Sequence, residues 1–236
     1  MIRAFVLVGI IVALGLPVAL VYLPLAALTG NATPLYNISL GIVRIALRLA
    51  GVRVQVSGLQ NVPAHTACIF MANHISNLDP PALLPHIPGR TSAFLKSSLM
   101  RIPILGFGLR LAEFVPVSRD GRTDSAIESV RVARLVLQKG LHITTFVEGT
   151  RSPDGRLLPF KKGPFYLAME AGAPCIPISI HGTQALMPRG RLRIRRGTAR
   201  IALHPPIQPS DFDSREDLML AVRQAIASGL PESMRN

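Results

Sequence analysis

The sequence predicts an α/β fold: a single domain with a mixed central sheet flanked by helices, preceded by an N-terminal membrane-inserting helical segment. Short apolar runs alternate with longer amphipathic segments along most of the chain, as in a sheet covered by helices. Residues 1–50 differ, because they are strongly apolar and almost uncharged. No internal repeat or low-complexity linker divides the rest. We therefore expect membrane-associated helices in residues 1–50 and one globular domain in residues 51–236.

The apolar N-terminus predicts a helix that enters a membrane. Ala4–Leu28 contains no charged residue and is long enough to cross the ~30 Å core of a bilayer at ~1.5 Å per residue. Pro17 and Pro24 interrupt this run, and in lipid such prolines permit a kink or a re-entrant path. A cleaved signal peptide is the alternative, although the run is long for one.

The next segment, Pro34–Ala50, has a broad apolar face and a narrow stripe that includes Arg44 and Arg48. Such a helix can lie in the membrane interface with its arginines at phospholipid phosphates. The alternative is a helix that covers the protein core. Arg44, Arg48 and Arg53 follow the apolar run, which favours a cytoplasmic location for the domain behind it.

Short apolar runs bounded by turn residues predict the strands of the domain. The first six are Val52–Ser57, Thr66–Met71, Thr91–Leu95, Glu113–Val117, His142–Val147 and Cys175–Ile180. Two more, Arg191–Arg195 and Thr198–His204, are expected to form a hairpin through Arg196-Gly197. Helices are predicted at Asp124–Gln138, Lys162–Ala171 and Ser214–Ser228, the last opened by the capping box Ser214-x-x-Asp217.

Composition restricts the partners. The chain has 26 Lys+Arg against 13 Asp+Glu, a formal net charge of +13, and 49% hydrophobic residues. This combination suits nucleic acid or an anionic membrane surface, but only 5% of residues are aromatic and Trp is absent. Base stacking is therefore poorly supported, and we expect a membrane phospholipid surface and no nucleic acid. Cys68 and Cys175 lie in apolar runs and are expected to be core thiols. No Cys/His cluster has metal-ligand spacing, so no metal is expected.

The segment Asn73-His74-Ile75-Ser76-Asn77-Leu78-Asp79 follows an apolar, strand-like run. On one continuous helix, side chains five positions apart would point ~140° away from each other. Asp79 precedes two prolines, however, which favours Asp79 as the N-cap of the helix that follows it and a turn that lets His74 fold back towards it. Such a pair can act as a general base with its orienting carboxylate. By itself the spacing is equally compatible with a strand-end histidine and a capping aspartate.

Three further blocks follow in order: Phe114-Val115-Pro116-Val117-Ser118-Arg119, Phe146-Val147-Glu148-Gly149-Thr150-Arg151-Ser152 and Cys175-Ile176-Pro177-Ile178-Ser179-Ile180. Together with the His74 block, they resemble the four sequence blocks of the glycerolipid acyltransferase family, and most closely those of bacterial 1-acylglycerol-3-phosphate acyltransferases. The resemblance runs from about Val52 to about Ile207. The chain departs from the family pattern at Val147, where the family usually has proline.

The resemblance implies a role for each block. His74 and Asp79 would be the catalytic pair. Lys96, Arg119, Glu148, Gly149, Thr150 and Arg151 would bind the substrate phosphate, while Ile176, Pro177 and Ile178 would form a wall of the acyl site. From the residues alone, Arg119 is as easily a solvated turn arginine, Lys96 an exposed lysine and Ile176–Ile178 ordinary core. Glu148 would be a costly negative charge beside a phosphate, so from the residues alone it is expected to bond an acceptor hydroxyl or to fix a basic partner. The N-terminal helices would sit in one membrane leaflet, and residues 51–236 would be the catalytic domain.

The expected reaction transfers a fatty acyl group from acyl-CoA or acyl-carrier protein to the 2-hydroxyl of 1-acylglycerol 3-phosphate, forming phosphatidate without a cofactor. The expected location is the inner (cytoplasmic) membrane, with the catalytic domain facing the cytoplasm. Arg191, Arg193 and Arg195 alternate along a predicted strand and would meet lipid headgroups or an acidic acyl-carrier protein. The alternatives are another acceptor, such as a lyso-ornithine lipid or glycerol 3-phosphate, a thioesterase that uses water, or a non-catalytic basic membrane-binding protein.

Overall fold

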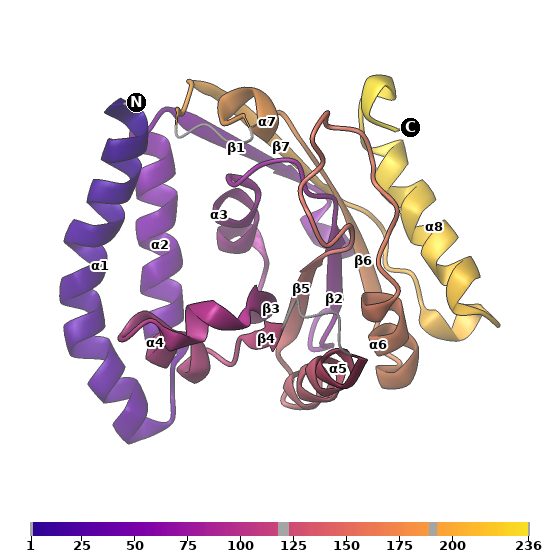
Figure 1. The fold of residues 1–236 in the computed structure, drawn as a ribbon, viewed down its shortest axis with the longest axis horizontal. Coiled ribbons are helices and arrows are strands. Elements are labelled where there is room, and N and C mark those ends of the chain that lie inside the picture. Colours follow the sequence, from indigo (N-terminus) through magenta and orange to yellow (C-terminus); the bar gives the residue numbers. More distant parts are fainter. Residues whose placement is uncertain (1, 118–122, 189–192, 236) are drawn as a thin grey trace.

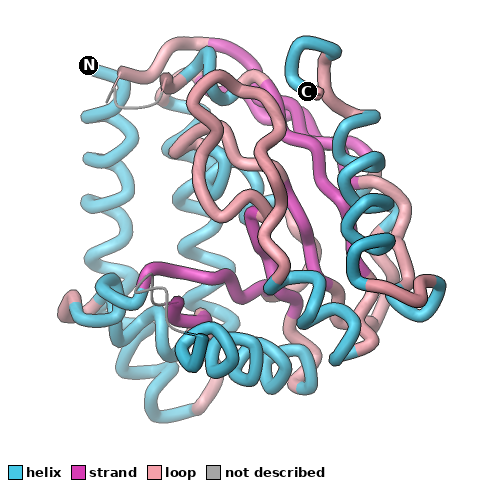
Figure 2. The backbone as a smooth tube through the Cα atoms, turned by 45° about the vertical axis from the view of Figure 1, so that its right-hand side comes forward, coloured by secondary structure: helices cyan, strands magenta, loops and turns pink. Residues whose placement is uncertain are grey.

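The computed structural model describes residues 2–117, 123–188 and 193–235, with the side chains of residues 96 and 123–126 left aside. A long helical pair stands against one side of a twisted sheet, and shorter helices cover the rest (Figure 1). In Figure 2 the strands run between the N-terminal helices and a second group of helices from the C-terminal half. The fold is therefore the α/β arrangement that the sequence predicts.

The N-terminal pair consists of α1 (Ile2–Thr29) and α2 (Thr33–Leu49), which run in opposite directions (Figure 1). Helix α1 continues through Pro17 and Pro24, and Ala26 is its one buried residue. Its length and mean hydropathy of 2.8 are those of a helix able to cross a membrane. An apolar helix this exposed needs a non-aqueous partner, since it leaves large side chains such as Phe5 and Leu20 uncovered.

Helix α2 covers the core. Its own residues Ile42, Ala46 and Leu47 are buried. The hydroxyl of Tyr36, also on α2, accepts a hydrogen bond from the Thr91 backbone N–H at 3.2 Å. Arg44 donates to the backbone carbonyl of Pro85, although its side chain is exposed. This bond attaches α2 to the domain, and the predicted arginine stripe at the membrane interface stays a prediction.

The strands are β1 (Val52–Ser57), β2 (Ile69–Ala72), β3 (Thr91–Lys96), β4 (Val115–Val117), β5 (His142–Phe146), β6 (Cys175–His181) and β7 (Gly197–Leu203). They form one sheet in the order β1-β7-β6-β2-β5-β3-β4. The β6–β7 pair is antiparallel and all the other pairs are parallel. The prediction of a mixed sheet is confirmed.

The predicted hairpin around Arg196-Gly197 is wrong in the part that can be seen, residues 193–204. Residues 193–196 are not in a strand, and β7 pairs in parallel with β1, from Val52 opposite Gly197 to Ser57 opposite Ala202. Ile194 is buried, and the Arg195 backbone N–H donates to the carbonyl of Leu186 at 2.8 Å. This stretch packs against a short helix instead of forming a strand. Residues 191 and 192 lie outside the described residues.

The helices of the domain are α3 (Asp79–Leu83), α4 (Leu105–Leu111), α5 (Thr123–Gln138), α6 (Gly163–Ala171), α7 (Thr183–Leu186) and α8 (Arg215–Ser228). One core cluster packs α2, α3 and α7 on one face of the sheet, and a second packs α5, α6 and α8 on the other. The predicted cap of α8 is confirmed, because the Ser214 hydroxyl accepts from the Asp217 N–H at 3.1 Å.

Cys68 and Cys175 lie beside neighbouring strands, β2 and β6, but face opposite core clusters. Alternation of side chains across the sheet therefore keeps two adjacent thiols apart. Both are free and fully buried. Burial raises the pKa of the Cys68 thiol to about 11 and that of Cys175 to about 12, so neither supplies a thiolate nucleophile near neutral pH.

Candidate active site

The candidate site lies where β2, β5 and β6 end. These three strands are adjacent and parallel, so the segments that follow them gather at one edge of the sheet. Residues 73–78 follow β2, the turn at residues 147–150 follows β5, and Gly182 and Thr183 follow β6. Residues from three distant parts of the sequence therefore meet at this edge.

His74 and Asp79 are in direct contact. The Nδ1 atom of His74 lies 2.8 Å from Oδ2 of Asp79, and the same oxygen accepts hydrogen bonds from the backbone N–H groups of Ile75 and Ser76 at 2.7 Å each. The turn that the sequence predicts is present, although Asp79 is the first residue of α3 and not the residue before it. The side chain of Asp79 is 0% exposed, whereas that of His74 is 18% exposed.

This geometry fixes the chemistry available to the imidazole. A carboxylate at Nδ1 favours the tautomer in which Nδ1–H donates to Asp79 and Nε2 keeps its lone pair. Phe146, the last residue of β5, stacks on the His74 ring with centroids 4.1 Å apart and an interplanar angle of 25°. The stacked Phe146 ring restricts tilting of the imidazole, and the bond to Asp79 restricts its rotation about the side-chain torsion. The basic nitrogen is left for a ligand, since Nε2 has no hydrogen-bond partner among the described residues.

Glu148 holds the backbone of His74. It is 1% exposed, and its Oε1 accepts from the His74 N–H at 2.8 Å while Oε2 accepts from the Leu158 N–H at 3.0 Å. On the other side, the His74 carbonyl accepts from the Ser152 N–H at 2.8 Å. Both carboxylate oxygens of Glu148 are therefore engaged within the protein, and its expected contact with a substrate phosphate stays a prediction.

Burial raises the pKa of Glu148 to about 7, and the nearby charge of Asp79 adds to that effect. The two backbone N–H donors and the charge of Arg223 act in the opposite direction. The guanidinium of Arg223 donates to the Leu158 carbonyl at 2.9 Å and lies over the Phe160 ring. The carboxyl group of Glu148, which bonds the backbone N–H of His74, thus has a pKa near neutral pH.

The predicted phosphate-binding residues are placed only in part. Gly149 and Thr150, in the turn that follows β5, are exposed, and Arg151, directly after this turn, is half-buried. The turn lies beside residues 73–78, the loop that carries His74 (the His74 loop). Gly149 has a φ of +70°, and a Cβ there would lie 3.0 Å from Cγ of Lys161, which explains a glycine at this position. The Lys96 backbone ends β3, two strands away from β2. Arg119 lies outside the described residues.

Ile176, Pro177 and Ile178 lie in the buried part of β6. Ile176 and Ile178 belong to the core cluster that also contains Leu78 and Leu83, beneath the His74 loop. Pairing between β6 and β7 stops at Ile178 opposite Leu203, and the bridge between Cys175 and Ile207 is separate. Pro177 occupies this break, so its missing N–H costs no ladder bond to β7. The predicted irregularity is present, while a role in an acyl site stays a prediction.

Several residues at the site were not singled out by the sequence. The Asn73 side chain donates to the Ile180 carbonyl at 2.9 Å and accepts from the Ile180 N–H at 2.7 Å, which ties the loop to β6. The Thr183 hydroxyl donates to Oδ1 of Asp79 at 2.5 Å. Neither contact has a local sequence signal, because the partners are more than a hundred positions apart. The position of Asn73 next to His74 was the only available indication.

Comparison with known proteins gives the family of this chain. The family model described as Acyltransferase matches residues 53–181, more than half of the chain. The chain belongs to the acyltransferase family. The matched segment includes the His74–Asp79 pair and the turn after β5, but stops before Thr183.

Curated relatives include a chloroplastic 1-acyl-sn-glycerol-3-phosphate acyltransferase of Brassica napus, 37% identical over 165 residues, which are 68% of this chain and 47% of the relative. A second, from Limnanthes alba and also named 1-acyl-sn-glycerol-3-phosphate acyltransferase, is 30% identical over 194 residues, 81% of this chain and 68% of the relative. The chain spans about half the length of the Brassica protein.

A solved acyltransferase has the same fold. The crystal structure of PlsC, the 1-acyl-sn-glycerophosphate acyltransferase of Thermotoga maritima, superposes with a TM-score of 0.78 and 28% sequence identity, covering 97% of this chain and 95% of that chain. The agreement therefore extends over the N-terminal helices as well as the sheet.

The departure of this chain from its family pattern has a structural consequence. The backbone N–H of Val147 donates to the carbonyl of Ala72 at 3.0 Å, which extends the β2–β5 pairing to the first position of the turn. Proline has no N–H and could not make this bond. Val147 is also fully buried in the second core cluster. Valine therefore joins the turn to the end of β2 by a hydrogen bond that proline could not make.

Proposed function

We propose that this protein transfers a fatty acyl group from acyl-CoA or acyl-carrier protein to the 2-hydroxyl of 1-acylglycerol 3-phosphate, giving phosphatidate in phospholipid biosynthesis. The observation that carries the proposal is the His74–Asp79 pair, a partly exposed imidazole whose Nδ1 lies 2.8 Å from a fully buried carboxylate. The names of the curated relatives and of the Thermotoga structure support the same acceptor.

In the proposed reaction, Nε2 of His74 accepts the proton of the acceptor hydroxyl as its oxygen attacks the thioester carbonyl carbon. The carbon–sulfur bond then breaks, and the imidazolium returns the proton to the leaving thiolate, so that the products are an ester and a free thiol. Asp79 stabilises the imidazolium and holds it in place. General-base assistance of this kind contributes typically 10²–10⁴-fold. The chain has no Gly-x-Ser-x-Gly elbow that would suggest an acyl-enzyme.

The remaining predicted residues have proposed roles around this pair. Arg119, Lys96 and the turn at Gly149–Arg151 would bind the glycerol phosphate, since guanidinium and backbone N–H groups suit phosphate oxygens. Ile176–Ile178 would support the acyl site from beneath, because Ile176 and Ile178 share a core cluster with Leu78 of the loop that carries His74. The proposed chemistry calls for no cofactor or metal.

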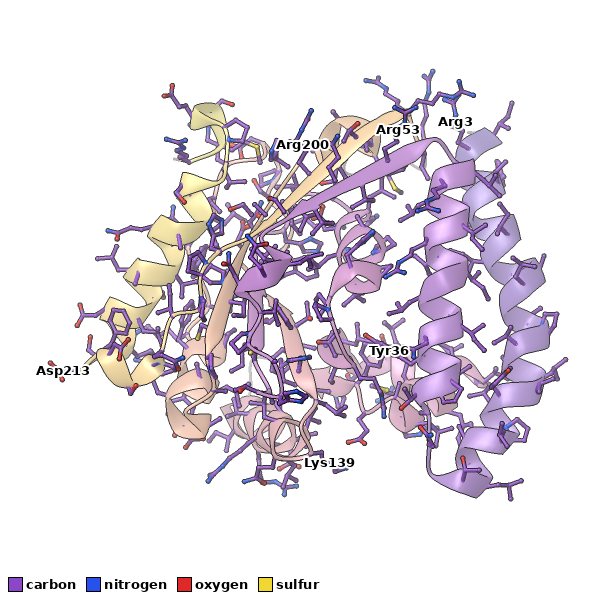
Figure 3. The ribbon with its side chains drawn as sticks, turned by 180° about the vertical axis from the view of Figure 1, so that it is seen from behind. Arg3, Tyr36, Arg53, Lys139, Arg200 and Asp213 are labelled. Carbon is purple, nitrogen blue, oxygen red and sulfur yellow. The ribbon has the colours of Figure 1, made fainter. Side chains whose placement is uncertain are left out.

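The proposal includes attachment to the inner membrane with the catalytic domain facing the cytoplasm. Two features support a membrane partner. Helix α1 presents exposed apolar side chains along its length, and the adjoining end of the molecule is cationic. Residues 1–78 contain no Asp or Glu, and Arg48, Arg53 and Arg196 line a cleft of about 670 Å³. Figure 3 shows Arg3 and Arg53 at the same end of the molecule, with Arg200 further along that side. Such a surface suits anionic phospholipid headgroups.

The test is an assay of the purified full-length protein in lipid–detergent micelles. Acyl-CoA or acyl-carrier protein is offered with a panel of lysolipids, and products are identified by mass spectrometry. We expect phosphatidate with 1-acylglycerol 3-phosphate, and a loss of about 10²–10⁴-fold in His74→Ala. The control His65→Asn changes an exposed histidine at positive φ and should leave turnover unchanged.

Each other outcome contradicts a stated part of the proposal. Product only from another lysolipid, such as a lyso-ornithine lipid, would change the acceptor. Thiol release that does not depend on any lysolipid would indicate hydrolysis. Unchanged turnover in His74→Ala would rule out the mechanism.

A further inference from the structure

The proposed reaction uses only one oxygen of Asp79. Oδ2 bonds the imidazole and two backbone N–H groups, whereas Oδ1 accepts one hydrogen bond from the described residues, that of the Thr183 hydroxyl at 2.5 Å. Both Asp79 and Thr183 are 0% exposed. The Thr183 hydroxyl has one proton to donate, and here it goes to Oδ1 of Asp79 over a distance at the short end of the range for O–H···O hydrogen bonds.

The backbone holds Thr183 rigidly. It is the first residue of α7, directly after Gly182, which has a φ of +88°. A Cβ at position 182 would lie 2.5 Å from the Thr198 carbonyl oxygen, so the turn is pressed against β7. The carbonyl of Thr183 in turn accepts from the Met187 N–H at 2.9 Å. The hydroxyl is therefore presented from a fixed corner of the fold.

The same corner binds the His74 loop at two further points. The Asn73 side chain pairs with both backbone groups of Ile180, near the end of β6. The Ser76 hydroxyl donates to the Met187 carbonyl, just after α7, at 2.9 Å. Contacts at the beginning, middle and end of the loop thus all lead to the segment from Ile180 to Met187.

We propose that Thr183 is a positioning residue of the acyl transfer, which acts by orienting Asp79 and, through it, the His74 base. This inference rests on the proposed function. A buried hydroxyl carries a desolvation cost that valine, of nearly the same shape, would avoid, and the hydroxyl of Thr183 is directed at the carboxyl group that contacts the imidazole of His74. Without it, Oδ1 is left unsatisfied and the carboxyl group can rotate away from the plane of the His74 ring.

The test compares Thr183→Val, which removes the hydroxyl and keeps the shape, with Thr183→Ser, which keeps the hydroxyl. We expect kcat to fall about tenfold to hundredfold in Thr183→Val with little change in KM, because loss of a hydrogen bond to a charged group is expressed in the transition state. Thr183→Ser should restore most of kcat. Thr144→Val is the matched control, since Thr144 is buried in β5, next to β2, and its hydroxyl bonds the hydroxyl of Thr91 at 2.7 Å.

A double-mutant cycle separates positioning from general destabilisation. In an Asp79→Asn background, Thr183→Val should cost less than about twofold, because its route to His74 is already damaged. The same fold-loss in both backgrounds, or an equal loss in Thr144→Val, would overturn the inference. So would an unchanged kcat in Thr183→Val. If Thr183→Val does not fold, as judged by circular dichroism, a normal kcat in Thr183→Ala overturns it and a lowered kcat rescued by Thr183→Ser supports it.

Failure of the inference differs from failure of the proposed function. Turnover that survives His74→Ala removes the proposed mechanism whatever Thr183 does. Turnover lost in His74→Ala but unchanged in Thr183→Val leaves that mechanism in place and removes only the role of Thr183.

Discussion

Glu148 binds the backbone of His74: its Oε1 accepts a hydrogen bond from the His74 N–H at 2.8 Å, while its Oε2 accepts one from the Leu158 N–H at 3.0 Å. The family block that contains Glu148 thus reaches the candidate base through the main chain. Asp79 fixes the His74 side chain from the other direction. The base is held at both ends, by two buried carboxyl groups that serve different purposes.

Replacing Glu148 with Gln should lower turnover. The amide oxygen can still accept from His74, but its NH₂ group would face the Leu158 N–H, donor against donor, so that bond is lost. We expect kcat to fall about tenfold, as for loss of one hydrogen bond that leaves a buried N–H without a partner, with Leu158 and the segment after the turn displaced. The measurement is steady-state kinetics, with Glu170→Gln, an exposed residue on α6, as control. Equal activity of the two variants would contradict the role given to Glu148.

Stability should depend on pH through Glu148. Its folded pKa, about 7, lies above the ordinary value of 4.5 because the group is buried, so the folded state keeps a proton that the unfolded chain has lost. The Glu148 contribution to the free energy of unfolding therefore decreases as pH rises from about 4.5 to about 7, by about 3 kcal/mol at most, and is constant above that.

The measurement is thermal melting by circular dichroism between pH 4.5 and pH 8.5. The melting temperature of the native protein should fall relative to that of Glu148→Gln over the lower part of this range and run parallel to it at higher pH. A difference between the two that rises with pH would show that the carboxylate is favoured by folding, contrary to the stated cause.

Val147→Pro should cost stability and little activity. It restores the residue usual in the family but removes the N–H that bonds the Ala72 carbonyl at 3.0 Å. We expect a loss of about 1 kcal/mol in the free energy of unfolding, measured by denaturation in detergent, with KM and kcat within about threefold of the native values. An unchanged or increased stability would mean that this hydrogen bond contributes nothing.

Charge reversal at the cationic end should weaken binding to anionic vesicles. Arg53→Glu combined with Arg196→Glu changes two side chains that line one cleft beside α2. We expect weaker co-sedimentation with phosphatidylglycerol-containing vesicles at low salt, and unchanged binding to neutral vesicles, which depends on α1.

The matched control is Arg134→Glu with Lys139→Glu, which changes the net charge by the same amount. Lys139 lies at the opposite end of the molecule (Figure 3). Equal weakening by both double variants would assign the effect to net charge and not to the cationic end.

Much of this protein could be predicted from local patterns. Short apolar runs bounded by turn residues located the strands, since a strand at the centre of the sheet is apolar whatever it pairs with. The apolar run at Ala4–Leu28 predicted α1, and Ser214-x-x-Asp217 predicted the start of α8. The His74–Asp79 contact was also accessible, because the prolines after Asp79 indicate a helix start and a turn before it.

Pairing and burial were not accessible in the same way. The stretch before Gly197 was predicted to return as a hairpin, but β7 lies beside β1, more than 140 positions earlier in the chain. The sequence placed Glu148 in the phosphate-binding block but did not indicate that its carboxyl group bonds the backbone of His74 and Leu158. In both cases the decisive partner is distant in sequence, and nothing local identifies it.

The sequence alone thus determined the kind of fold, the apolar N-terminal helix and the chemical groups at the end of β2, because helix and strand periodicity and proline-directed turns act over a few residues. Only the tertiary structure decided which strands pair, that α2 covers the core, and that Thr183 and Glu148 support the two halves of the base. These choices depend on burying particular surfaces together and on satisfying each buried polar atom, which are properties of the whole folded chain.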